Sequence, residues 1–125
     1  ALAGFSRAIA LMPGMAPAYY NRADVLLRIG RPDEALRDYD RSIALYPELA
    51  VVAHTGRGIA LKMLGRLDEA LTSLDQAIKL NPDLAEAHVN RGNVLEAQGR
   101  ADEAKASFLR AAEIDPKFAA LASKN

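Results

Sequence analysis

Charged residues that could take part in acid–base chemistry recur at regular intervals along the chain. Asp-Glu pairs stand at residues 33–34, 68–69 and 102–103, each two positions after an arginine. Two carboxyl groups that share one pocket can work as a general acid and a general base. Here one pair occurs in each interval, so we do not expect two pairs to share a pocket. We interpret the pairs as the first turns of helices, where the helix dipole favours negative charge.

Two histidines and the absence of cysteine limit the metal sites that the sequence can form. His54 and His88 are the only histidines, and they stand 34 residues apart. In neighbouring helical units, equivalent residues lie about 10 Å apart, too far for one zinc ion with bonds of about 2 Å. Because the sequence also has no phosphate-binding glycine loop, we expect no metal, no cofactor and no catalytic residues. The histidines are predicted to be partly buried structural residues.

A third set of charged residues consists of Arg22, Arg57 and Arg91. Each stands directly before a small residue, so we expect its aliphatic stem to lie along a helix interface with the guanidinium at a polar edge. We favour a structural ladder in which these arginines pair with neighbouring carboxylates or carbonyl groups. Contact with a ligand is the alternative.

These residues recur in phase because the whole chain is built on a repeat of 34 or 35 residues. Gly-Arg dipeptides and prolines mark the period, the dipeptides at residues 30–31, 65–66 and 99–100 and the prolines at residues 13, 47, 82 and 116. Within one unit, His88, Gly92 and Leu95 have the spacing of one helix face. A glycine after the first helix favours its termination. Each unit is therefore predicted to form two helices, such as 85–98 and 102–114.

Columns of small and large residues at equivalent positions indicate how the helices pack. The small columns are Ala23, Gly58 and Gly92; Ala1, Ala35, Ala70 and Ala104; and Ala8, Ser42, Ala77 and Ala111. The large columns are Leu26, Leu61 and Leu95; and Phe5, Tyr39, Leu74 and Phe108. Small residues let two helices approach closely, and large residues fill the remaining gaps. We expect these columns to form the core.

The composition favours a helical protein with a protein partner. The chain has 125 residues, 25 of them alanine, and only 6% are aromatic, which favours helices over sheets. Sixteen Lys or Arg residues balance 16 Asp or Glu residues, unlike the basic surface of a nucleic-acid-binding protein. No apolar run approaches the roughly 18 residues that a membrane-spanning helix needs. We expect neither nucleic acid nor membrane insertion.

The repeated residues resemble the tetratricopeptide repeat, whose signature of about 34 residues is W-x2-L-G-x2-Y, then A-x3-F, then P. In the last full unit the matching positions hold His88, Arg91, Gly92, Leu95, Ala104, Phe108 and Pro116. Tyr or His replaces the family's Trp in each full unit, and Arg replaces its Leu. The resemblance covers essentially the whole chain. It implies an all-α fold, a right-handed superhelical solenoid of helix-turn-helix units with about seven helices.

The period divides the chain into units of one array. We expect a single array over residues 1–125, with a half repeat at 1–15, full repeats at 16–50, 51–84 and 85–118, and the start of a next or capping helix at 119–125. Because the chain begins within a unit, we expect it to come from a longer protein.

The resemblance also implies that the first helices line a concave groove in which an extended peptide or a partner helix binds. The residues expected in that peptide-binding groove are Tyr20, Asn21, Asp24, Leu27, Arg28, Thr55, Ile59, Lys62, Met63, Val89, Asn90 and Asn93. Asparagine amides can bind a peptide backbone, and apolar side chains supply contact area. The sequence thus predicts a non-enzymatic scaffold for protein–protein interaction.

Two features of the groove need separate interpretation. Some members of the family grip the terminal carboxylate of chaperones with Lys, Arg and Asn. Four of those positions depart here and hold Tyr20, Asp24, Gly56 and Glu86, so we predict no such clamp. Gly56 also lies within a helix, at a cost of about 1 kcal/mol relative to alanine. We favour neutral drift at Gly56, with a notch for a ligand side chain beside Ile59 as the alternative.

Two other functions remain as alternatives. Arrays of this kind resemble bacterial repeats that can precede glycosyltransferase-like domains, so the chain could be the interaction arm of a larger enzyme. Self-assembly into a homo-oligomer is the other alternative. Terminal repeats need polar caps, and apolar residues at both ends of this array could remain bare: Leu2, Phe5, Phe118 and Leu121.

Overall fold

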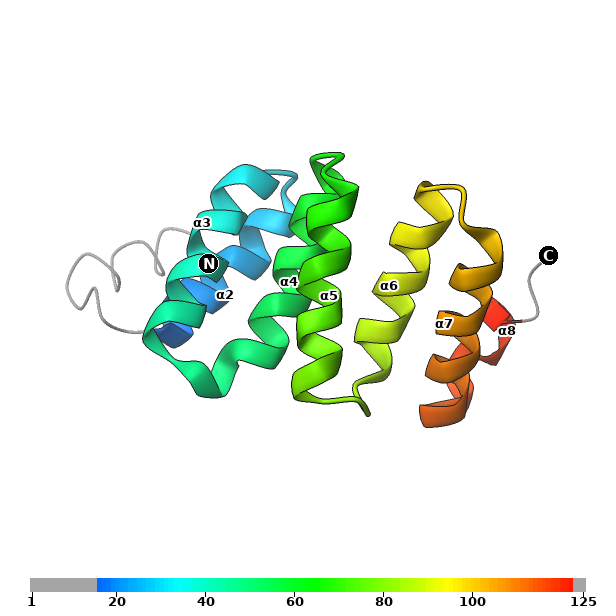
Figure 1. Cartoon of the computed structure of the whole chain (residues 1–125). Helices are drawn as coiled ribbons and strands as arrows, with labels where there is room; N and C mark the ends of the chain where they lie inside the picture. The colour runs from blue at the N-terminus through cyan, green and yellow to red at the C-terminus, as the bar shows by residue number, and fades with distance from the viewer. Residues whose placement is uncertain (1–15, 123–125) are drawn as a thin grey trace.

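The computed structural model describes residues 16–122, which form a row of helices joined by short turns (Figure 1). Six helices form three pairs: α2 (Ala16–Arg28) with α3 (Pro32–Leu45), α4 (Ala50–Met63) with α5 (Leu67–Leu80), and α6 (Ala85–Ala97) with α7 (Ala101–Ile114). The turns η1 (Pro47–Leu49) and η2 (Pro116–Phe118) lead into α4 and into α8 (Ala119–Ala122). The predicted all-α solenoid is confirmed. None of the described helices is both long and apolar enough to span a membrane.

Glycines with a left-handed backbone end the first helix of every pair: Gly30, Gly65 and Gly99. After α4, the amide of Arg66 donates to the carbonyl of Leu61 at 2.9 Å, and the amide of Gly65 donates to that of Lys62 at 3.0 Å. These two bonds form a Schellman motif, which satisfies carbonyl groups that the helix end leaves unpaired. The same pair of bonds follows α2 and α6. The helix ends predicted from the Gly-Arg dipeptides are confirmed.

Replacing Gly65 with alanine is expected to lower the free energy of unfolding by about 1 kcal/mol. A β-carbon on Gly65 would meet no atom within 4 Å, so the cost comes from the positive φ of 78° and not from crowding. Gly65→Asn is the matched control, because asparagine tolerates this backbone region better than alanine. Urea denaturation should place the asparagine variant between the alanine variant and the wild type. Equal losses in both variants would contradict the backbone explanation.

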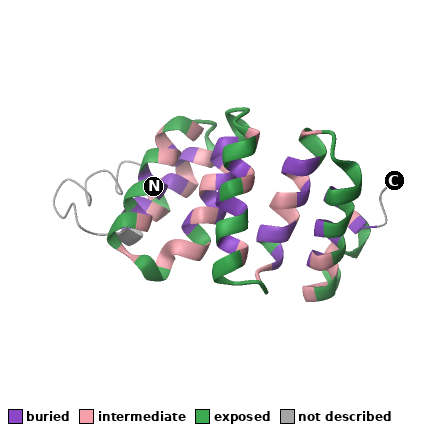
Figure 2. Ribbon diagram, viewed as in Figure 1, coloured by how far each residue is buried: buried purple, intermediate pink, exposed green. Residues whose placement is uncertain are grey.

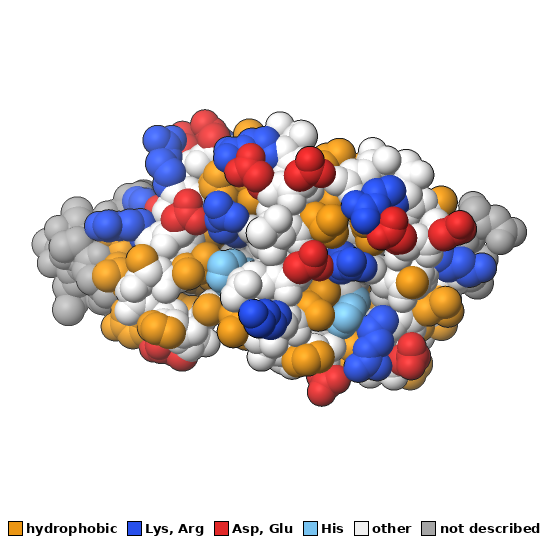
Figure 3. Space-filling model, in the orientation of Figure 1, with side chains coloured by type: hydrophobic (Ala, Val, Ile, Leu, Met, Phe, Trp, Pro, Cys, Tyr) orange, Lys and Arg blue, Asp and Glu red, His pale blue; other side chains and the backbone are white. Residues whose placement is uncertain are grey.

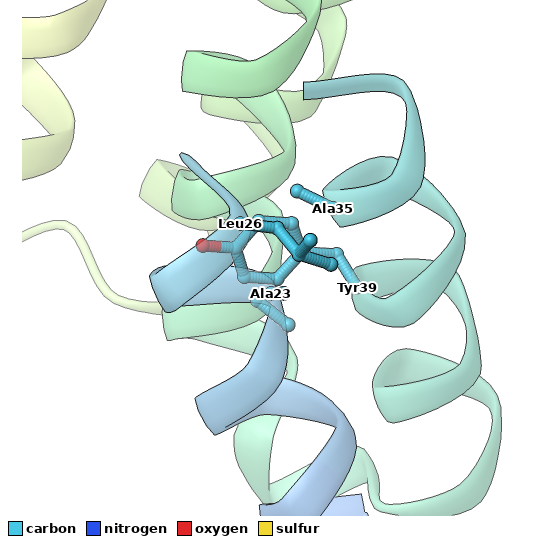
Figure 4. Close-up of a cluster of buried hydrophobic side chains, with 5 residues drawn as sticks. Ala23, Leu26, Ala35 and Tyr39 are labelled. Atoms are coloured by element: carbon cyan, nitrogen blue, oxygen red, sulfur yellow. The ribbon is translucent and has the colours of Figure 1, made fainter. Parts of the chain in front are cut away.

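Buried residues lie mainly on the parts of the helices that face neighbouring helices, as the purple ribbon in Figure 2 shows. In the first pair, Ala23 and Leu26 of α2 pack against Ala35 and Tyr39 of α3 (Figure 4), and Ala53 of α4 completes the cluster. Two further clusters follow along the array, one of Leu61, Ala70, Leu74 and Val94 and one of Leu95, Ala104, Phe108 and Ala122. The predicted columns are confirmed wherever the structure describes them. Their remaining members, Ala1, Phe5 and Ala8, lie outside the described residues.

The first helices of the three pairs form a layer of their own. α2 contacts α4, and α4 contacts α6. The second helices α3, α5 and α7 make no comparable contacts with one another, although each packs on the helix that follows it. Elements on the concave side of a curved array lie closer together than those on the convex side. The exposed surface of α2, α4 and α6 is therefore the inner face of the array.

The end of the array that follows α7 is partly covered. Ala122 of α8 is buried in the cluster that contains Phe108, and Leu121 packs against that cluster. Phe118 is half-buried, with the Lys117 ammonium 5.1 Å from its ring centre. The expectation of bare apolar surface at Phe118 and Leu121 is therefore wrong, because α8 folds back on α7. Leu2 and Phe5, at the other end, lie outside the described residues.

Candidate functional site

The inner face contains two hollows that meet at Ile59. The first hollow has a volume of about 250 Å³ and lies between α2 and α4, with the start of α6 at one side. The second hollow has a volume of about 190 Å³ and lies between α4 and α6. Thr55, Ile59 and Lys62 have the i, i+4, i+7 spacing of one helix face. Helix α4 therefore presents a continuous line of side chains to both hollows.

A carboxylate and two tyrosine rings lie in the first hollow. Tyr20 and Asp24 stand one turn apart on α2, and Tyr39 reaches them from α3. The Tyr39 hydroxyl donates a hydrogen bond to Asp24 Oδ1. The rings of Tyr39 and Tyr20 meet edge to face, with their centres 5.9 Å apart. Mostly apolar groups complete the lining: Leu27, Val52, Thr55, Gly56, Ile59, Leu84 and Glu86.

Burial and the neighbouring carboxylate keep both phenols protonated. Burial raises the pKa of Tyr20, and the charge and hydrogen bonding of Asp24 raise it further. Burial is the main reason that the pKa of Tyr39 lies far above its usual value, and the hydrogen bond to Asp24 raises this pKa further. The positive charge of Arg28 lowers it. At neutral pH the two phenols are therefore hydrogen-bond donors and not bases.

Gly56 makes room for the Tyr39 ring. A β-carbon built on Gly56 would overlap the outer edge of that ring, which is fully buried. The chain itself thus fills the space that a side chain at residue 56 would need. This contact corrects the interpretation of Gly56 as neutral drift, because an added side chain would overlap the ring. The alternative, a notch for a ligand side chain beside Ile59, stays a prediction, since Gly56 and Ile59 both line the first hollow. The glycine is a packing partner of a tyrosine from another helix.

Amide and ammonium groups line the second hollow. Asn90 and Asn93 stand on successive turns of α6, and Lys62 lines the opposite side from α4. An amide offers both donors and acceptors, whereas a lysine offers donors only. This set is suited to acceptors such as peptide carbonyls or a carboxylate. The other lining residues are Gly58, Ile59, Met63, Leu74 and Val94.

Nine of the twelve residues predicted for the groove line one of these hollows: Tyr20, Asp24, Leu27, Thr55, Ile59, Lys62, Met63, Asn90 and Asn93. Asn21 and Arg28 are exposed and line neither. Val89 is half-buried and packs against the cluster that contains Phe108 and Ala122. Its side chain therefore contributes to the contact between α6 and the end of the array.

The sequence prediction of the groove did not include Tyr39 and Leu84. Tyr39 stands in a core column whose other described members are Leu74 and Phe108, so its position indicated packing alone. The hydroxyl of Tyr39 could have indicated a role beyond packing, because a buried tyrosine usually has a hydrogen-bond partner. Leu84 precedes α6 and gave no signal of its own.

The arginine ladder begins with a nearly buried ion pair. Arg22 of α2 binds Asp38 of α3 through Nε and Nη2, both at 2.6 Å from a carboxylate oxygen. The Asp38 side chain is only 5% exposed. The hydrogen bond to Asp38 raises the pKa of the Arg22 guanidinium, so the guanidinium stays charged at neutral pH.

The other two arginines pair with exposed carboxylates. Arg57 Nε lies 2.7 Å from Asp40 and Arg91 Nε lies 2.8 Å from Asp75. Each guanidinium also donates to a buried serine hydroxyl, Ser73 and Ser107 respectively. Figure 3 shows positive and negative side chains next to one another on the face that it displays. The structural role predicted for the three arginines is confirmed.

The Asp-Glu pairs lie in the first turns of α3, α5 and α7, as predicted. Each glutamate also forms an ion pair with the arginine three residues before it, with an N···O distance of 2.6 Å in Arg31–Glu34, Arg66–Glu69 and Arg100–Glu103. All of these arginines are exposed. The acidic pairs thus stabilise helix starts and line neither hollow on the inner face.

Both histidines are at least partly buried, as predicted. His88 is buried, and its Nε2 lies 2.9 Å from the carbonyl oxygen of Pro82. His54 is half-buried, and its Nδ1 has no hydrogen-bond partner among the described residues. Burial lowers the pKa of His54, and the charge of Arg57 lowers it further. In the described part of the chain, no group of three or more side chains could hold a metal ion.

Three family models match the chain along most of its length. Models described as tetratricopeptide repeat match residues 16–49 and 85–118. A model described as TPR repeat matches residues 58–99. No curated protein matches the sequence.

Solved structures of several repeat proteins share this fold. A crystal structure of MamA has a TM-score of 0.83 at 22% identity and covers 92% of this chain and 67% of its own. A MamA structure from Desulfovibrio magneticus RS-1 has a TM-score of 0.83 at 22% identity, and the match covers 93% of this chain and 65% of the MamA chain. The TPR domain of Arabidopsis OM64 has a TM-score of 0.79 at 21% identity, and the match covers 86% of this chain and 89% of the OM64 chain. The chain spans about two thirds of the length of these MamA chains.

Proposed function

The chain belongs to the tetratricopeptide repeat family, and from that premise we propose that it is a non-enzymatic scaffold that binds an extended peptide or a partner helix on its inner face. Repeats of this family serve as protein-interaction modules. The proposal places the ligand in the two hollows that meet at Ile59, with α4 along the middle of the binding surface. We also propose that the array divides into the units predicted from the sequence, at residues 1–15, 16–50, 51–84, 85–118 and 119–125.

The observation that carries the proposal is the line of accessible apolar side chains along the two hollows. Val52 and Met63 are exposed large hydrophobic residues at opposite ends of α4, and each lines one hollow. Ile59 lies between them and remains half-exposed. Contiguous apolar surface of this kind is typical of a surface that a partner covers. A concave shape adds contact area on several sides of a bound segment.

The polar groups in the hollows supply direction and specificity. Asn90 and Asn93 can each donate to a carbonyl and accept from an amide of a peptide backbone. Lys62 adds a positive charge at the same hollow, whereas Asp24 and Glu86 place negative charge at the first one. A bound segment therefore meets opposite charges at the two ends of the surface. We expect this difference to fix its orientation.

Met63→Asp is expected to weaken binding of peptides selected from a random display library by about tenfold or more, because it places a charge in an apolar contact. Leu80→Asp is the matched control. Met63 and Leu80 are the last residues of α4 and α5 and are 48% and 49% exposed, so aspartate has a similar effect on both helix ends. Of the two residues, Met63 alone lines one of the two hollows of the inner face. Fluorescence anisotropy with the selected peptides gives the affinities, and equal losses in both variants would rule out the inner face as the binding surface.

A further inference from the structure

The Asp24 carboxylate differs from the other carboxylates that lie between the first helices and the second helices. Asp38, Asp40 and Asp75 each form an ion pair with an arginine of the ladder. Asp24 forms no ion pair with any described residue, and its described hydrogen-bonding partners are the neutral hydroxyls of Tyr39 and Tyr20. A carboxylate has about four acceptor positions. Acceptor capacity on Asp24 therefore remains for a donor that enters the first hollow.

The walls of the first hollow suit a long side chain with an apolar stem. Leu27 and Ile59 line it with Tyr20 and Tyr39, and the tyrosine rings meet edge to face. Lysine and arginine bury their methylene groups along apolar surface while the charged end reaches a polar group. Aromatic faces also attract cations. Both properties match a cationic side chain whose charged end lies at Asp24.

The charges around the hollow favour the same occupant. Glu86, at the start of α6, adds a second negative charge to the lining. No lysine or arginine lines the first hollow. Arg28 is exposed one turn beyond Asp24, and Lys62 lines the second hollow. Positive charge on the chain itself therefore lies outside the first hollow, and its interior is complementary to a cation.

We propose that the first hollow is a specificity pocket for a lysine or arginine side chain of the bound segment, with Asp24 as its counter-ion. This inference rests on the proposed function, because it names the chemistry of one residue in the ligand. Tyr39 acts as a positioning residue, since its hydroxyl holds the Asp24 carboxylate. The second hollow, with Lys62, Asn90 and Asn93, then receives acceptor groups of the same segment.

The test is a selection of random displayed peptides on the wild type and on Asp24→Asn. Asparagine keeps the shape of the side chain and an oxygen that can accept the Tyr39 hydroxyl, so the variant is expected to fold. Lysine or arginine should be enriched at one position of the peptides selected on the wild type and lose that enrichment on Asp24→Asn. For one enriched peptide, replacing its basic residue with norleucine, or Asp24 with asparagine, should each weaken binding about tenfold.

The two changes together should weaken binding little more than either one alone, because they remove the same contact. Additive losses would overturn the pocket assignment. The pocket assignment would also be overturned if the peptides selected on the wild type showed no enriched basic residue but bound in a way that depends on Met63. The proposed function would still stand in that case. If the selected peptides bind Met63→Asp and Leu80→Asp equally, or if no peptides are enriched, the proposed function fails and the pocket assignment fails with it.

Discussion

Arg22→Ala is expected to lower the free energy of unfolding by about 3 kcal/mol. Arg22 holds Asp38 with two hydrogen bonds of 2.6 Å, and the Asp38 side chain is 5% exposed. Without the arginine, the carboxylate would remain buried and lack its cationic partner. Removing one member of a buried ion pair costs more than the pair contributes, because the remaining charge has lost both water and its counter-ion.

Arg57→Ala and Arg91→Ala are the internal controls for this prediction. Their partners Asp40 and Asp75 are 53% and 52% exposed, so water can solvate the freed carboxylates. We expect each control to cost about 1 kcal/mol, mostly through the lost hydrogen bond to a buried serine. Urea denaturation followed by circular dichroism measures all three variants. If Arg22→Ala lost no more stability than the controls, the burial of Asp38 would not increase the cost of removing its arginine partner, and the prediction would be wrong.

A paired substitution separates the buried charge from the rest of the contact. In Arg22→Met with Asp38→Leu, both charges are absent and apolar side chains of similar length fill the interface. We expect this variant to regain most of the stability that Arg22→Ala loses, because no unpaired carboxylate remains. A double variant as unstable as Arg22→Ala would instead show that the geometry of the arginine itself is required.

The fold was predictable from the sequence because the residues that determine it occur in every unit. Gly65 ends α4 as its equivalents end α2 and α6, and the small residue at Ala70 recurs at Ala35 and Ala104. Each such position is constrained by the same contact in every copy. A pattern repeated in phase therefore specifies where helices end and which faces meet, even without a strongly amphipathic helix.

The candidate site was less predictable because its chemistry belongs to single copies. Only Tyr39 in its column has a hydroxyl, and only there does Asp24 stand within reach on the partner helix. Val89 lies on the predicted face of α6, yet it packs at the end of the array because a short helix folds back there. Helical spacing predicts which residues share a face. It does not tell which neighbour will cover one residue of that face.

Gly56→Ala is expected to destabilise the protein by about 2 kcal/mol, although alanine in a helix interior is normally more stable than glycine by about 1 kcal/mol. The added methyl group would overlap the Tyr39 ring, which is buried in the cluster with Ala23, Leu26 and Ala53. The ring would have to shift or the two helices would have to separate. Urea denaturation of the single variant gives the sign of the effect.

Making Gly56→Ala in a Tyr39→Leu variant tests whether the Tyr39 ring causes the loss of stability. Leucine stands at the equivalent position of the next unit, Leu74, and its shorter side chain leaves room above residue 56. Gly56→Ala should then be neutral or stabilising by up to about 1 kcal/mol, as its helix propensity predicts. A loss of the same size in both backgrounds would mean that alanine acts through something other than the tyrosine ring. Because that ring also holds the hydroxyl that binds Asp24, glycine at residue 56 connects the packing of the core to the first hollow.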